Sequence, residues 1–129
     1  MGKFASTGCY DGGFNTFKAA SGTVTQTLCS AQPSNYAGIA TNKLASVTID
    51  KTNDITLSTG DTANANSLFG RKMTIAAKSA VAVTTSGTGN HVVLDNGTEF
   101  FVTTCPSTAV ASGGTVDIGT WKDEIQAPV

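Results

Sequence analysis

Charged side chains are scarce in this chain of 129 residues. Asp, Glu, Lys and Arg make up 13% of it, with 8 basic against 9 acidic residues and a formal net charge of -1. Proteins that hold nucleic acid by its phosphates need a field of positive charge, and this composition supplies none. We therefore expect no nucleic acid among the partners.

Long hydrophobic runs are also absent. No window approaches the roughly 20 apolar residues that a membrane-spanning helix requires. The opening MGKFASTGCYDGG lacks the apolar stretch of a secretory signal. We expect a protein that is made in the cytoplasm of its host and has no membrane partner.

Cysteine and histidine are too few to build the common catalytic and metal sites. Cys9, Cys29 and Cys105 are odd in number and form no Cys-x-x-Cys pair, which argues against a disulfide framework and a zinc site. His91 is the only histidine, and a lone strand histidine more often packs than catalyses. The run DKTNDITLSTGD has the composition of a calcium loop but lacks its sixth-position glycine and closing glutamate. The sequence predicts no enzymatic activity, no cofactor and no bound metal.

Threonine, serine, glycine and asparagine dominate instead, and from residue 23 onward apolar residues alternate with them at a period of two. Turn signals recur every ten or so residues. This pattern predicts a mainly β fold, an antiparallel β-sandwich or barrel of about eight short strands. The expected strands cover residues 23–29, 45–50, 54–58, 71–77, 81–84, a hairpin at 91–104, 115–118 and 121–125, with the polar stretch 59–67 as a loop.

The chain divides near residue 22, with an N-terminal arm or short helix in residues 1–22 and a single β domain in residues 23–129. Asp11 is a candidate cap for a short helix through residues 15–20 that places Phe14 and Phe17 on one face. Large aromatic residues are unusual in such a polar segment, so we expect it to pack across a neighbouring subunit. The anchors would be Phe4, Tyr10, Phe14 and Phe17.

The hairpin HVVLDNGTEFFV has two apolar faces, whereas a surface hairpin needs only one. Asn96-Gly97 favours a two-residue turn, which sets Val93 opposite Phe100 and Val92 opposite Phe101. We expect the face with Phe101 to line the core. A partner or the N-terminal segment would cover the face with Phe100, which joins the predicted interface. The surplus apolar surface favours self-association, as a trimer or as a set of capsid-bound copies.

Four stretches carry a resemblance to a known family. LCSAQPSNYAGIATNKLASVTI, GRKMTIAAKSAVAVTTSGTGNHVVL, FFVTTC and SGGTVDIGTWKDEI, in this order, resemble small virion-associated proteins of tailed bacteriophages that are encoded among the head genes. The likeness runs from about residue 28 to residue 128 and is most specific in residues 28–36 and 70–94. It implies an all-β protein after a short N-terminal helix. The role implied is a capsid cement or decoration protein that binds the major capsid protein on the outer shell of the virion.

Other roles remain open at this stage. A tail-tube, head-completion or host-adhesion component of the virion would share the fold, and position in the particle separates these roles. A carbohydrate-binding module or small hydrolase expects exposed aromatic rings or paired acids. Aromatic residues are only 7% of the chain and Trp121 is the sole tryptophan, so this last alternative is the weakest.

Overall fold

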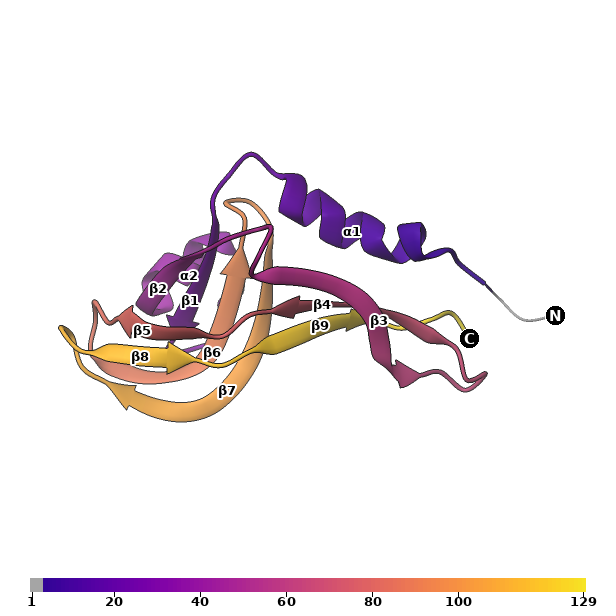
Figure 1. Ribbon diagram of the computed structural model, residues 1–129. Coiled ribbons are helices and arrows are strands. Elements are labelled where there is room, and N and C mark those ends of the chain that lie inside the picture. The colour runs from indigo at the N-terminus through magenta and orange to yellow at the C-terminus, as the bar shows by residue number, and fades with distance from the viewer. Residues whose placement is uncertain (1–3) are drawn as a thin grey trace.

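The computed structural model describes residues 4–129 and contains nine antiparallel strands and two helices (Figure 1). The mainly β, antiparallel fold predicted from the alternating pattern is therefore confirmed. In chain order the elements are α1 (Thr7–Ala19), β1 (Val24–Cys29), α2 (Tyr36–Asn42), β2 (Lys43–Ile49), β3 (Ile55–Ala63), β4 (Phe69–Ile75), β5 (Lys78–Ala82), β6 (Gly87–Asp95), β7 (Phe100–Val110), β8 (Thr115–Ile118) and β9 (Trp121–Ile125).

The strands form three sheets. One has four strands in the order β2-β1-β6-β7, a second has the order β3-β4-β9, and the third pairs β5 with β8. Since β5 follows β4 and β9 follows β8 along the chain, the last two sheets are successive parts of one long, bent ribbon (Figure 1). No ladder joins β7 to β8 or β9, so the sheets face each other without closing into a barrel.

The core lies on the inner face of the four-stranded sheet. Val24 and Leu28 of β1 and Val92 and Leu94 of β6 point to this face and are at most 4% exposed. In β1 the core residues alternate with Thr25 and Thr27, which is the period-two pattern of the sequence. Each such side chain contributes roughly 1.5–3 kcal/mol when it is fully buried.

Helix α1 belongs to this core. Phe14 and Phe17 lie on one face, as predicted, and are 1% and 4% exposed. Three glycines lower the intrinsic helix propensity of this segment, so packing and not propensity stabilises the helix. The helix begins at Thr7, so Asp11 is not its cap. The Asp11 carboxylate instead accepts two hydrogen bonds from the guanidinium of Arg71 in β4, at 2.9 and 3.0 Å.

The second apolar face of the hairpin is covered by α2, a helix that the sequence pattern did not predict. Ile39 of α2 packs against Val93 and Cys29, and Phe100 and Val102 pack against the same cluster. The Asn35 side chain caps this helix by accepting a hydrogen bond from the Gly38 amide at 2.9 Å. The expected cover, a partner or the N-terminal segment, is thus replaced over Val93 by a helix of the same chain.

The hairpin turn differs from the two-residue turn predicted for Asn96-Gly97. Four residues connect the strands, and Val93 lies opposite Val102. Asn96 Oδ1 accepts hydrogen bonds from the amides of Thr98 and Glu99 at 3.1 and 2.8 Å, which stabilises the longer loop. Gly97 supplies the positive φ of 96° that the loop needs. Because the register moves by two residues, the predicted division of side chains between the two faces is unchanged.

Strand β3 extends into the polar stretch that was expected to be a loop, so only residues 64–68 connect β3 to β4. The added residues pair with β4 after a register shift between Thr59 and Ala63. A Cβ atom on Gly70 would clash with the Ile125 carbonyl oxygen, so β4 and the end of β9 approach within a distance that only glycine permits. Neither described helix is long and apolar enough to cross a membrane.

We expect Gly70→Ala to lower the free energy of unfolding by roughly 3 kcal/mol, since the added methyl group meets backbone that cannot move aside. Gly12→Ala is the matched control, because a Cβ atom there meets nothing within 4 Å and alanine favours a helix. It should raise stability by about 0.5–1 kcal/mol. Urea unfolding of both variants checks the pair, and equal stabilities would contradict the close packing at Gly70.

The two phenylalanines of the hairpin should differ in their contribution to stability. The Phe101 ring centroid lies 5.1 Å from that of Phe17 and 6.2 Å from that of Phe14, whereas Phe100 packs only at the edge of the α2 cluster. We expect Phe101→Ala to cost about 3 kcal/mol and Phe100→Ala about half as much, because a smaller cavity is left. Thermal unfolding of both variants tests this order; the reverse order would refute it.

Candidate interaction surface

A groove of about 520 Å³ opens between α1 and the strands β7 and β9. Its apolar walls come from Phe14, Phe17, Phe100, Phe101 and Ile125. Gly12 and Gly13 also line it, and the absence of side chains on these two residues leaves the helix side of the groove open. The groove is thus a largely apolar concavity with aromatic rings on several sides.

Two carboxylates enter this apolar groove. Asp123 of β9 lies opposite Met73 in the ladder, and Met73 is opposite Leu57, so the acid occupies the inner face in a row that is otherwise apolar. Burial raises the pKa of the Asp123 carboxyl. Glu99, in the hairpin loop, is exposed at the rim.

Asp123 and Glu99 differ from the other acids in the bonds that their side chains make. Within residues 4–129, Asp123 and Glu99 are the acids whose side chains accept no hydrogen bond and form no ion pair. The other seven of the 9 acids accept at least one: Asp11, Asp50, Asp54, Asp61, Asp95, Asp117 and Glu124. The two acids that accept no hydrogen bond within residues 4–129 therefore both line one groove.

Large apolar side chains are exposed at the same end of the molecule. There the tip of the β3–β4 hairpin and the C-terminal segment come near one another (Figure 1). We call this set the apolar end. Its members, with their exposed fractions, are Leu68 (38%), Phe69 (51%), Ile125 (38%) and Val129 (68%).

The hairpin tip that carries Leu68 and Phe69 is held by one side chain. Asn64 Oδ1 accepts hydrogen bonds from the amides of Asn66 and Leu68 at 2.8 and 3.0 Å. Asn64 Nδ2 donates to the carbonyl oxygens of Ala127 and Pro128, which ties the C-terminal segment to the tip. Ser67 adopts a positive φ of 59° in this loop, a conformation that costs free energy and persists because its surroundings fix it. The apolar end is therefore preorganised.

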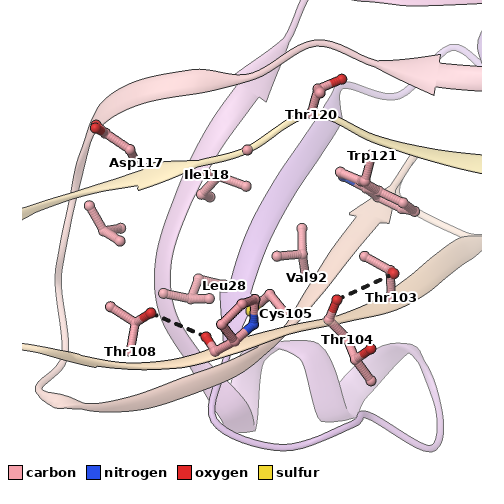
Figure 2. Close-up of a pocket in the computed structure, with 13 residues that line it drawn as sticks. Leu28, Val92, Thr103, Thr104, Cys105, Thr108, Asp117, Ile118, Thr120 and Trp121 are labelled. Atoms are coloured by element: carbon pink, nitrogen blue, oxygen red, sulfur yellow. Dashed lines mark hydrogen bonds between the residues drawn. The ribbon is translucent and has the colours of Figure 1, made fainter.

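A second cavity, of about 290 Å³, lies in the open seam between β7 and the β8–β9 segment (Figure 2). Leu28, Val92 and Ile118 give it an apolar floor, and threonines from both sides surround it. Burial raises the pKa of the Cys105 thiol, which also lines the cavity.

The β7 edge of this seam is poorly suited to pairing with an added strand. Pro106 has no amide proton to donate. Its carbonyl oxygen accepts a hydrogen bond from Thr108 Oγ1 at 3.1 Å, and the Thr104 carbonyl accepts one from Thr103 Oγ1 at 3.5 Å (Figure 2). Edge strands are commonly protected in this way. The seam is thus a weaker candidate for a protein interface than the groove.

The predicted interface residues separate in the structure. Phe14, Phe17 and Phe100 come together at the groove, but Phe14 and Phe17 are buried by the chain itself, so they form its floor and are not free anchors. Phe4 is exposed ahead of α1, and Tyr10 is half-buried on α1.

The sequence reasoning missed Asp123, Leu68, Phe69 and Ile125. A signal for Asp123 was present, since Trp121, Asp123 and Ile125 alternate on one face of a strand and the middle residue breaks the apolar pattern. The turn that exposes Leu68 and Phe69 depends on Asn64 and has no comparable signal in the sequence.

Within residues 4–129, no metal site forms around His91 or around the acids of the run DKTNDITLSTGD. His91 lies opposite Thr104, not Val102 as the predicted turn required, and its Nδ1 is 2.6 Å from Asn90 Oδ1. In residues 4–129 no three His, Cys, Asp or Glu side chains come together to hold a metal ion. The carboxylates of the DKTNDITLSTGD run bind backbone amides and lysines instead.

Comparison with known proteins gives no relative: no protein-family model, no curated protein and no solved structure matches this chain.

Asp123 predicts a dependence of stability on pH. Its folded pKa is raised, so between the unfolded and the folded pKa the native state binds the extra proton, and stability falls as pH rises through this window. Asp123→Asn removes that loss. The variant should match the wild type below about pH 4 and become the more stable of the two as pH approaches 7. Urea unfolding at several pH values measures the difference; a stability difference that does not change with pH would contradict the burial of this charge.

Proposed function

We propose that this protein is a structural, non-enzymatic component of a tailed-phage virion, a capsid cement or decoration protein that binds the outer shell and bridges major capsid subunits. Self-association, as a trimer, is part of the proposal. The resemblance of residues 28–128 to head-gene virion proteins supports a place in the virion. The apolar end supports binding to other virion subunits.

The observation that carries the proposal is the exposure of large apolar side chains on a rigid support. Exposing Phe69 and Leu68 to water is unfavourable, yet the Asn64 bonds hold their loop in place. Apolar side chains that are exposed together mark interaction sites in soluble proteins, and fixed anchors lose little entropy on binding. The apolar end therefore has the properties of a surface that a partner covers.

The low net charge also suits a protein that binds one capsid shell in many copies. A formal net charge of -1 creates little repulsion between neighbouring copies. An interface of ordinary size, about 1,600 Å² in total, gives affinities from micromolar to nanomolar and below, depending on its anchors. Copies that contact each other as well as the shell gain further from avidity.

Substitution at the apolar end tests the proposal. We expect the double variant Leu68→Ser with Phe69→Ser to fold normally, because both side chains are exposed, and to bind empty capsids at least tenfold more weakly. Tyr36→Ser is the matched control, since Tyr36 is 44% exposed on α2, outside the apolar end, and should bind like the wild type.

Sedimentation of capsids with bound protein measures the occupancy, and thermal unfolding checks the fold. Undiminished binding of the double variant would remove the apolar end from the interface. If the wild type does not bind capsids at all, the cement role fails, and a place elsewhere in the virion becomes the better proposal.

A further inference from the structure

We propose that the groove between α1 and β7–β9 binds an arginine side chain of a partner protein. The guanidinium would contact Asp123, and the partner's apolar residues on either side of the arginine would pack among the phenylalanine rings. The inference deepens the proposed function, because it names the chemistry of the partner at a surface that adjoins the apolar end through Ile125.

Charge complementarity is the first argument. Asp123 lies on the inner face of β9 beside Met73, which is fully buried, and no described side chain or backbone amide donates to it. Asp123 is half-buried, so its carboxylate has lost part of its hydration without gaining a partner, and a cation in the groove would supply the missing interaction. Glu99 at the rim adds a second negative charge on the path into the groove.

The chain's own cations are committed elsewhere. Of the seven basic side chains in residues 4–129, six bond to a carboxylate or a carbonyl oxygen: Lys18, Lys51, Arg71, Lys72, Lys78 and Lys122. The seventh, Lys43, follows α2, on the other side of the molecule from α1 (Figure 1). Within residues 4–129, therefore, no basic side chain is placed to pair with Asp123.

The aromatic walls favour arginine over lysine. Phe100 and Phe101 are half-buried and present part of their rings to the groove, above the buried floor of Phe14 and Phe17. A guanidinium is planar, is more weakly hydrated than an ammonium and stacks on aromatic rings while it bonds a carboxylate with two parallel hydrogen bonds. A lysine ammonium gains less from such walls and loses more hydration.

Asp123 has a simpler possible role, since an inward-pointing charge on an edge strand discourages pairing with other strands. Such a role needs an exposed β9 edge and no bound cation. The two roles predict different responses of a bound peptide to the charge of Asp123.

The experiment uses three peptides that differ in one side chain: N-acetyl-Leu-Arg-Leu-amide, the lysine analogue, and the citrulline analogue, which keeps the shape of arginine without its charge. Each is titrated into the nitrogen-15-labelled full chain, and amide shifts of Gly12, Gly13 and Asp123 report on the groove. We expect saturable shifts with the arginine peptide. Its dissociation constant should be lower than that of the lysine peptide and at least tenfold lower than that of the citrulline peptide.

Asp123→Asn should weaken arginine binding at least tenfold and make the arginine and citrulline peptides equivalent. Glu124→Gln is the matched control, because Glu124 is the next residue on β9 and its side chain bonds the Thr62 amide on the opposite face. It should leave binding unchanged. Thermal unfolding confirms that both variants are folded, and Asp123→Asn is expected to be no less stable than the wild type near pH 7.

Three results would overturn the proposal: no saturable shift at the groove, equal binding of the arginine and citrulline peptides, or undiminished binding by Asp123→Asn. If instead Asp123→Asn and Lys43→Met both abolish self-association while the peptides do not bind, the occupant is a second copy and not an arginine of another protein. Capsid binding through Leu68 and Phe69 is measured separately, so failure of this inference leaves the proposed function standing.

Discussion

Three phenylalanine rings, those of Phe14, Phe17 and Phe101, hold α1 against the β-sheets, and the candidate interaction surface depends on this contact. The Phe101 ring lies within 6.2 Å of both helical rings, centroid to centroid. Asn96 Nδ2 adds a hydrogen bond to the Phe17 carbonyl oxygen, which joins the hairpin loop to the helix. Without these contacts a helix with three glycines would not persist, and the groove would lose one of its walls.

The groove and the apolar end form one continuous surface, because Ile125 belongs to both. Charges beside it are largely neutralised within the chain: Asp61 pairs with Lys72 and Lys122 on the outer face of the same ribbon, and Arg71 pairs with Asp11. Asp123 is half-buried in the groove and accepts no hydrogen bond from the described residues. An interface built on this surface would thus combine apolar burial with one specific charge.

The sequence predicted what depends on local alternation. Strand β9 was placed at its observed bounds, with Trp121 and Ile125 on one face. The two faces of the hairpin were assigned correctly because a shift of two residues preserves alternation. The side of α1 that carries Phe14 and Phe17 was also predicted, since three residues make nearly one helical turn.

Features that depend on contacts between distant residues could not be read in this way. The helix α2 is seven residues long and is stabilised by the cover that Ile39 gives to Val93, a pairing that local sequence does not show. The close approach of Gly70 to β9 likewise joins residues that are far apart in the sequence. Among the predicted anchors, Phe14 and Phe17 turned out to be buried by the chain itself, because burial against a partner and burial against the same chain leave the same sequence pattern.

The central claim is that the apolar end and the adjoining groove are covered in the virion. A cryo-electron microscopy reconstruction of the particle, with the present fold fitted into the density, tests it most directly. The account predicts this chain on the outer shell, with the β3–β4 tip and the groove beside α1 in contact with neighbouring subunits. A fitted chain whose apolar end and groove both face solvent would contradict it.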